Sequence, residues 1–308
     1  MDCRNLCHFI LTRFNLLLWT KDKEGNKVRT KKWLEHRFRL FEQYCLPSIA
    51  NQTCKDFEWI VLFDSSTPDR FKERIKELQT KCPQLVPVFV EPEKGRYFAQ
   101  IFLDEVRRRL GENIGLLCSK SDKNLKGNQP EKFQHFHKRV LTTYLDNDDA
   151  LNIHFVENLQ RRAADLSDGT FIYYRDGYQL FTDHHYLMRI YYPRNHFASV
   201  VEDGNPATLK TIYGYGSHYY IDQIKGAKIE YVKDMPMWCE VIHDKNMGND
   251  AYFLKAKMVR DAEILQREFA LDETIKADVG LYFFRFLPRY LKTFVRRIII
   301  RIRGYRFE

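Results

Sequence analysis

The sequence lacks the features that assign many chains to a class at once. Its 308 residues contain no apolar run near the roughly 18 residues of a membrane span. The apolar N-terminal residues are interrupted by His8, Arg13 and Asn15, which is not typical of a signal peptide. The seven cysteines include no CxxC pair and no Cys/His cluster with zinc spacing. We therefore expect reduced, mostly buried thiols in a cytoplasmic protein.

Most of the chain has almost no net charge, because its basic and acidic residues balance, and the net positive charge is concentrated at the C-terminal end. Residues 285–308 carry eight Lys/Arg and one acid, which is +7 of the net +9. A nucleic-acid binder would usually spread positive charge over its folded surface, so we expect no nucleic-acid partner.

The apolar residues of this tail share one helical face, and the basic residues lie beside each other on another. This pattern predicts a basic amphipathic helix in a tail of residues 281–308, lying on an anionic membrane surface. The alternative is a C-terminal helix docked on the preceding domain, residues 1–280, with its basic face in water.

Apolar segments alternate with helical stripes along the first half of the chain. The pattern predicts strands at 6–11, 57–63, 85–90 and 140–145, and helices at 34–49, 68–78, 96–110 and 153–166. Such alternation is typical of an α/β fold with a mostly parallel sheet and helices on both faces. Short strands at 170–182, 186–192 and 227–232 are separated by turn signals and are interpreted as added hairpins.

Ligands of such sheets bind beyond the carboxyl ends of the strands. Thr12 and Arg13 follow the first predicted strand, Asp64 the second, and residues 146–149 (DNDD) the fourth. Carboxylates crowded in this way repel each other unless a cation or hydrogen-bond donors compensate. Hard oxygen ligands favour Mg²⁺ or Mn²⁺. An exposed acidic turn, with Asp149 capping the next helix, is the alternative interpretation.

Three segments resemble a known family and occur in its order: TRFN at 12–15, FEWIVLFDSSTP at 57–68 and TTYLDNDDAL at 142–151. They are similar to GT-A glycosyltransferases, and most of all to the bacterial rhamnosyltransferase-like group related to family 2. The resemblance covers about residues 5–250. It implies a Rossmann-like GT-A fold, a nucleotide-sugar donor bound across the first βαβ half, and Mn²⁺ or Mg²⁺ between the diphosphate and the D-x-D carboxylates.

The chemistry of sugar transfer fits these residue types. Negative charge builds on the departing nucleoside diphosphate and must be neutralised in the transition state. We expect Asp148, with Asp146 beside it, to hold a divalent ion for this purpose, and Arg13 to add a bidentate phosphate contact. The predicted nucleotide-sugar contacts are Thr12, Arg13, Asp64, Asp146 and Asn147. The alternatives are a solvated charge for Arg13 and a turn cap for Asp64.

Two further assignments rest on the resemblance. The segment 237–246, MWCEVIHDKN, is similar to the WxxVxHxxN stretch of the same group, which implies His243 as a third metal ligand. A strand-end histidine bonded to backbone is the alternative. Glu202-Asp203 is similar to the ED pair of family 2 enzymes, which implies that one of them is the base of an inverting transfer. No Q-x-x-R-W follows the pair, and an acidic hairpin turn before Gly204 is the alternative.

The predicted function is transfer of a sugar from a nucleotide-diphosphate donor to a surface glycan or a lipid-linked acceptor, at the inner face of the membrane. The resemblance suggests rhamnose as the sugar. Tyr213, Tyr215, Tyr219 and Tyr220 suit stacking on sugar rings, or belong to the core. A sugar nucleotidyltransferase would usually have a Gly-rich phosphate loop near the first strand, which TRFN does not provide. The other alternative is a non-enzymatic membrane- or nucleic-acid-binding module. Such a module would use the tail and would give the acidic cluster no role.

Overall fold

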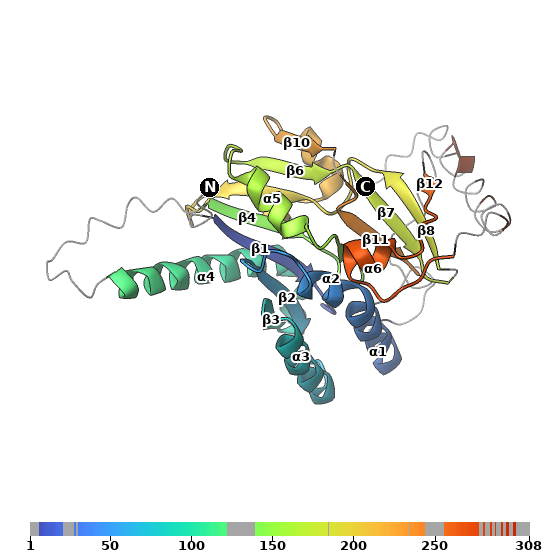
Figure 1. The fold of residues 1–308 in the computed structure, drawn as a ribbon. Coiled ribbons are helices and arrows are strands. Elements are labelled where there is room, and N and C mark those ends of the chain that lie inside the picture. Colours follow the sequence, from blue (N-terminus) through green and yellow to red (C-terminus); the bar gives the residue numbers. More distant parts are fainter. Residues whose placement is uncertain are drawn as a thin grey trace, which may run out of the picture.

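The computed structural model describes residues 6–20, 28, 30–121, 139–183, 185–233, 235–243 and 256–276, together with eight single positions between 280 and 299. Within 30–121, side chains are described as far as residue 111. Figure 1 shows the described chain as a mixed α/β structure built on two sheets.

A seven-stranded sheet forms the centre of the fold, in the order β10-β6-β9-β4-β1-β2-β3. All of its neighbouring strands are parallel except β9, which runs antiparallel to both β4 and β6. Its strands are β1 (Leu6–Arg13), β2 (Glu58–Asp64), β3 (Leu85–Val90), β4 (Arg139–Tyr144), β6 (Thr170–Tyr174), β9 (Ser199–Asp203) and β10 (Lys228–Val232). The predicted mostly parallel sheet is therefore confirmed.

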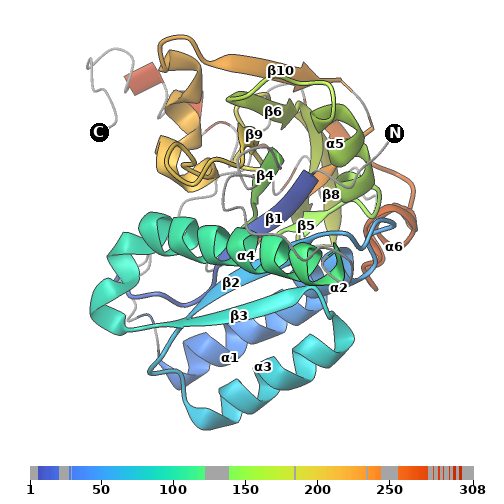
Figure 2. The ribbon, with the colours of Figure 1, turned by 90° about the vertical axis from the view of Figure 1, so that its left-hand side faces the viewer.

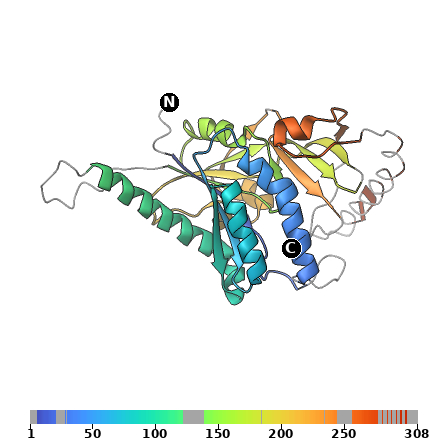
Figure 3. The same cartoon turned by 60° about the horizontal axis from the view of Figure 1, so that its bottom comes forward.

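Helices cover both faces of this sheet, because alternate strand residues point to opposite sides. Ile10 belongs to the core under α1 (Lys31–Leu40), α3 (Asp69–Lys81) and α5 (Phe155–Ala163), whereas Phe9 and Leu11 pack on the side of α4 (Phe98–Ser121). Figure 2 shows α4 on one side of β2 and β3, with α1 and α3 on the other. Figure 3 shows α4 extending outward from the sheet.

A second, five-stranded sheet has the order β12-β8-β7-β11-β5. Its elements are β5 (Ala150–Leu151), β7 (Asp176–Phe181), β8 (Tyr186–Tyr191), β11 (Trp238–Ile242) and β12 (Lys257–Met258), followed by α6 (Ile264–Phe269). β7 and β8 form the expected antiparallel hairpin. The segment 227–232 is not a hairpin strand, because β10 pairs parallel to β6. The segment 170–182 divides into β6 and β7, which belong to different sheets.

The helix expected at 34–49 continues through Pro47, with a change of helix type before it. α1 passes into a π-helical turn, η2 (Phe41–Cys45), and then into α2 (Leu46–Ala50). Proline cannot donate the hydrogen bond of a regular helix. The wider π turn places this residue where the bonding pattern is already changed: the amide of Leu46 donates to the carbonyl of Phe41.

The described cysteines are free thiols, as expected for this sequence. Cys45, Cys82 and Cys239 are buried, and burial raises the pKa of each of them. None of the described helices has the length and apolar character needed to span a bilayer. Most of the predicted helix in the tail lies outside the described residues.

Candidate functional site

The aspartate segment 146–149 lies where the two sheets meet. It follows β4 of the large sheet and precedes β5 of the small sheet. β1, the parallel neighbour of β4, ends at Arg13 beside it. β11 of the small sheet ends at Ile242, and His243 follows it. His196 precedes β9, whose first residue, Ser199, pairs with Thr143 near the end of β4. Parts of the chain far apart in sequence therefore converge on four consecutive residues.

Asp146, Asp149 and His196 form the first part of the site. Each offers one ligand atom, and these atoms lie within 4.8 Å of one another. His196 Nε2 lies 2.7 Å from Asp149 Oδ2, and the backbone N–H of Val241 donates to Asp149 Oδ1 over 2.8 Å. Asp149 is fully buried, whereas the Asp146 side chain keeps 30% of its exposure. Asp146 is therefore the carboxylate of this trio that solvent reaches.

The Asp149–His196 pair retains a proton near neutral pH. Burial raises the pKa of Asp149 to about 8, although the hydrogen bond from His196 acts in the opposite direction. Burial alone would lower the pKa of His196, but its hydrogen bond to Asp149 and the charge of that carboxylate raise the pKa to about 9. A metal ion that used both side chains would have to displace this proton.

Arg13 reaches the site through an aromatic enclosure. Its Nη2 donates to the hydroxyl of Tyr144 over 2.6 Å, and that hydroxyl donates to Asp146 over 2.9 Å. The guanidinium carbon lies 4.7 Å from the ring centre of Phe98 and 5.4 Å from that of Tyr213. The side chain remains 25% exposed. A cation held in this way keeps its orientation while one side is open to an anionic ligand.

Asp148 forms the second part of the site, with Arg37 and His243. Its Oδ2 accepts hydrogen bonds from Arg37 Nη1 over 3.1 Å and from His243 Nε2 over 2.9 Å. Burial alone would raise the pKa of Asp148, but Arg37 and His243 lower it well below its usual range. Asp148 and His243, two predicted metal ligands, are thus in contact, and an arginine shares the same carboxylate oxygen.

Asn147 is held by the protein itself. Its side-chain oxygen accepts from Arg37, and its Nδ2 donates to the carbonyls of Arg13 and Phe14 over 2.7 and 3.0 Å. These bonds fasten the segment 146–149 to the end of β1. The amide predicted to contact a nucleotide therefore links parts of the chain in this structure.

Thr12 and Asp64 lie at the expected edge, but their side chains are engaged internally. Thr12 is fully buried and accepts a hydrogen bond from Trp59 Nε1 over 2.9 Å. Asp64 is also fully buried, and its Oδ1 accepts from the backbone N–H of Ser66 over 2.8 Å and from the Ser66 hydroxyl. This corresponds to the turn cap that was the alternative interpretation of Asp64.

Glu202 and Asp203 are not brought to the aspartate segment. β9 is antiparallel to β4, so Asp203 pairs with Arg139 at the beginning of β4, whereas the segment 146–149 follows its end. The Glu202 carboxylate is buried and accepts from the backbone N–H groups of Lys210 and Thr211, both over 2.9 Å. The Tyr215 hydroxyl donates to it over 3.1 Å. These contacts hold the Glu202 carboxylate inside the protein.

Four site residues were not singled out by the sequence analysis as ligands or donors: Arg37, Tyr144, Asp149 and His196. His196 precedes its strand, β9, whereas the residues predicted for the site follow their strands. An antiparallel strand places its beginning at the edge where parallel strands end. Arg37 lies within an ordinary amphipathic helix, and no local signal distinguishes it from other basic residues.

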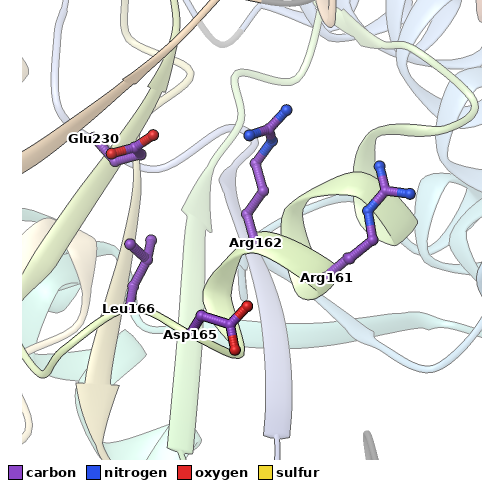
Figure 4. Close-up of a pocket in the computed structure, with 5 residues that line it drawn as sticks. All are labelled: Arg161, Arg162, Asp165, Leu166 and Glu230. Carbon is purple, nitrogen blue, oxygen red and sulfur yellow. The ribbon is translucent and has the colours of Figure 1, made fainter. Parts of the chain in front are cut away.

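A separate surface depression lies at the opposite edge of the large sheet (Figure 4). It is lined by Arg161, Arg162, Asp165, Leu166 and Glu230. Leu166 lies near the beginning of β4, because Arg139, the first residue of β4, donates to the carbonyls of Ala163 and Leu166. The depression is therefore not part of the aspartate site.

The donor set at 146–149 fits a hard divalent cation. Two carboxylates and one imidazole converge in Asp146, Asp149 and His196, and such ligands suit Mn²⁺ or Mg²⁺. Asp148 fits less well, because Arg37 already neutralises it. Charge therefore argues against Asp148 as a metal ligand, because a cation there would lie next to the Arg37 guanidinium in a buried environment.

Comparison with solved structures finds weak likenesses. The crystal structure of S. aureus TarS 1-349 has 12% sequence identity and a TM-score of 0.39, with 76% of this chain and 60% of that chain covered. S. aureus TarS 1-349 in complex with UDP has 11% identity and a TM-score of 0.37, with 77% and 60% covered. The match thus spans 60% of the length of either structure. A search of the curated proteins finds no match.

Comparison with protein families gives a match over most of the sequence. The matching model is described as "Putative rhamnosyl transferase", and it aligns with residues 8–117 and 120–253. These ranges include Arg13, the whole segment 146–149, His196 and His243. The chain therefore belongs to this rhamnosyl transferase family.

Proposed function

We propose that the protein is a metal-assisted glycosyltransferase that moves a sugar from a nucleotide-diphosphate donor to an acceptor hydroxyl. Membership of the rhamnosyl transferase family supports glycosyl transfer, and rhamnose is the sugar we propose. The observation that carries the proposal is the meeting of Asp146, Asp149 and His196 with Arg13 at the carboxyl edge of parallel strands. This edge is where α/β sheets bind their ligands.

Arg13 has the role of a phosphate contact in this proposal. The guanidinium has fixed donors, and Tyr144 and the surrounding rings hold its orientation before a ligand arrives. Preorganised donors of this kind stabilise charge that develops on a leaving group without reorganisation during the reaction. Tyr144 positions Arg13 and Asp146 together, because its hydroxyl joins the two side chains.

The metal would be held by Asp146, Asp149 and His196. A bound Mn²⁺ or Mg²⁺ supplies Lewis-acid stabilisation of negative charge on the diphosphate. Val241 fixes one oxygen of Asp149 through its backbone N–H, which leaves the other oxygen toward His196. Asp146, the more exposed carboxylate, lies on the side that a donor can reach.

Donor hydrolysis tests this proposal without knowledge of the acceptor. The purified protein is incubated with UDP-, GDP- and dTDP-sugars, including dTDP-rhamnose, with and without Mn²⁺. We expect release of one nucleoside diphosphate only when Mn²⁺ is present. Asp146→Asn should lower this rate by about 100-fold, a typical effect of losing transition-state charge stabilisation.

Asp165→Asn is the matched control for this experiment. Asp165 is an exposed carboxylate at the opposite edge of the sheet, so its replacement should leave hydrolysis unchanged. Wild-type rates in Asp146→Asn, or rates that do not depend on the metal, would contradict the proposed site.

The acceptor that we propose is a surface glycan or lipid-linked glycan, reached by peripheral attachment to an anionic membrane. Seven apolar side chains described in the tail are 42–84% exposed: Phe284, Leu287, Leu291, Phe294, Val295, Ile298 and Ile299. The same segment has the +7 charge of residues 285–308. Anionic lipid adds roughly 1 kcal/mol of binding per Lys or Arg near its surface. Exposed apolar side chains and positive charge together suit such a surface.

Vesicle co-sedimentation tests the attachment. We expect the protein to sediment with vesicles that contain phosphatidylglycerol, to bind neutral phosphatidylcholine vesicles much less, and to dissociate at high salt. Phe294→Asp with Ile298→Asp should abolish sedimentation, whereas Tyr231→Asp, at an exposed aromatic residue in β10, should not. Unchanged sedimentation after deletion of residues 285–308 would refute the role of the tail.

A further inference from the structure

Arg37 lies at the site although it comes from an element remote from the strand ends. α1 begins after Thr30, whose hydroxyl accepts from the backbone N–H of Trp33 over 3.2 Å. Leu34 and Phe38 anchor the helix in the core, and this places Arg37 between them on the side of the aspartate segment. The Arg37 side chain is only 10% exposed. A cation this buried requires a defined partner.

That partner is a pair of adjacent residues in the aspartate segment. Arg37 Nη1 lies 3.1 Å from Asp148 Oδ2, and Nη2 donates to Asn147 Oδ1. Asn147 in turn donates to two carbonyls at the end of β1. A single guanidinium thus neutralises one carboxylate and holds the segment against the neighbouring strand.

Asp148 differs from Asp146 and Asp149 because an arginine donates a hydrogen bond directly to its carboxylate. The Asp148 side chain is 7% exposed, and the same oxygen accepts from both Arg37 and His243. A divalent ion at that oxygen would have to displace the guanidinium or lie beside it, and either arrangement is costly in a buried environment. Asp146, Asp149 and His196 have no arginine in hydrogen-bond contact among the described residues; Arg13 lies 3.7 Å from Asp146.

We propose that Arg37 acts as an internal cation that occupies Asp148, so that the metal site consists of Asp146, Asp149 and His196 without Asp148. This inference rests on the metal site of the proposed function and deepens it. Arg37 is a positioning residue: it acts through Asn147 and Asp148 and not on the donor. The middle carboxylate of the segment then supports the fold of the site, and the metal affinity is limited by a nearby positive charge.

Direct binding of Mn²⁺, followed by the EPR signal of the free ion, tests this inference without activity. We expect the double variant Arg37→Gln with Asp148→Asn, which removes the ion pair without changing the net charge, to bind Mn²⁺ within about twofold of wild type. Asp146→Asn should weaken binding at least about tenfold, as loss of a ligand does. Arg37→Gln leaves Asp148 without its guanidinium and should bind Mn²⁺ about tenfold more tightly, because a positive charge close to the ion has been removed.

Two further variants separate charge from folding. Arg37→Lys keeps the positive charge and should keep the wild-type affinity for Mn²⁺ even if its thermal stability falls. Arg39→Gln, at an exposed arginine on the same helix, is the matched control and should change neither property. Should Arg37→Gln alone fail to fold, the measurements on the double variant and on Arg37→Lys still decide the inference.

The outcomes separate this inference from the proposed function. If wild type binds Mn²⁺ and the double variant Arg37→Gln with Asp148→Asn weakens that binding tenfold or more, the inference is overturned and the metal site of the proposed function stands with a different ligand. If neither wild type nor Arg37→Gln binds Mn²⁺ at millimolar concentration, both are refuted.

Discussion

At the scale of the residue, neighbouring carboxylates in the segment 146–149 have different environments. Asp146 is partly exposed and linked to Arg13 through Tyr144. Asp148 is neutralised by Arg37, and Asp149 shares a proton with His196 in the interior. Successive side chains in a turn point in different directions, so one acidic run contains a partly exposed carboxylate, a buried ion pair and a buried carboxylate bonded to a histidine. Like-charge repulsion is thereby compensated group by group.

His8 predicts a measurable pH dependence of stability. It is 2% exposed, and burial lowers its pKa to about 3. Below the unfolded pKa of about 6.5 the unfolded chain binds a proton that the folded chain does not, so stability falls as the pH drops from about 6.5 toward 3. His8→Gln should reduce the slope of unfolding free energy by about 1 kcal/mol per pH unit between pH 6 and 5.

Urea denaturation at several pH values measures this slope. Gln160→Leu is the control: Gln160 approaches His8 Nδ1 at 3.4 Å, and its loss lowers stability without removing a titrating group. An unchanged slope in His8→Gln would show that His8 does not make this contribution.

Gly177 predicts a steric effect in the small sheet. A Cβ at this position would overlap the ring of Trp238, which is buried, stacks on Phe197 at 4.9 Å and donates to the Tyr174 carbonyl. Gly177→Ala should therefore lower the free energy of unfolding by about 1–3 kcal/mol, as overpacking does.

Gly111, within α4, provides the comparison. A Cβ at this position meets nothing within 4 Å, so Gly111→Ala should raise the free energy of unfolding by about 0.5–1 kcal/mol. Thermal unfolding compares the two; equal effects would contradict the steric argument.

At the scale of the element, the direction of β9 decides whether His196 and Glu202 lie near the site. Because it runs antiparallel to β4, its beginning lies near the site and its end lies away from it. Glu202 then anchors the chain that returns toward the site. That chain contains Thr211, which has a positive φ of 64°, and the turn η5 (Ile212–Tyr215), which carries Tyr213 to Arg13. Such a backbone conformation in a non-glycine residue persists only when its surroundings hold it.

Glu202→Ala distinguishes this anchoring role from that of a base. The buried N–H of Thr211 would lose its acceptor, so the free energy of unfolding should fall by about 1–3 kcal/mol. Tyr215→Phe, which removes one of the three hydrogen bonds, should cost about 1 kcal/mol. Urea denaturation gives both values. Loss of sugar transfer with unchanged stability would favour the base that the ED resemblance implied.

At the scale of the whole molecule, the site joins two sheets. Asp146 follows a strand of the large sheet, and the N–H that fixes Asp149 belongs to β11 of the small sheet. A ligand bound to Asp146 and Asp149 therefore contacts groups whose positions depend on both sheets. Its binding energy should stabilise the fold as a unit.

Thermal unfolding with Mn²⁺ and a nucleoside diphosphate tests this coupling. A ligand at a hundred times its dissociation constant adds about 2.7 kcal/mol to the free energy of unfolding, so we expect a single transition at a higher temperature. UDP, GDP and dTDP are compared in turn, and Asp146→Asn should remove the shift. A transition that does not move at millimolar ligand would contradict a site shared by the two sheets.

The sequence by itself determined the alternation of strands and helices, the parallel central sheet and the acidic segment at its edge. These properties depend on local periodicity and on the rule that parallel strands end together. The tertiary structure alone decided the direction of β9. This direction places His196 next to the aspartate segment and Glu202 toward the opposite end of β4. It also decided that Arg37 neutralises Asp148, because pairing between residues 111 positions apart depends on how α1 packs and not on any local pattern.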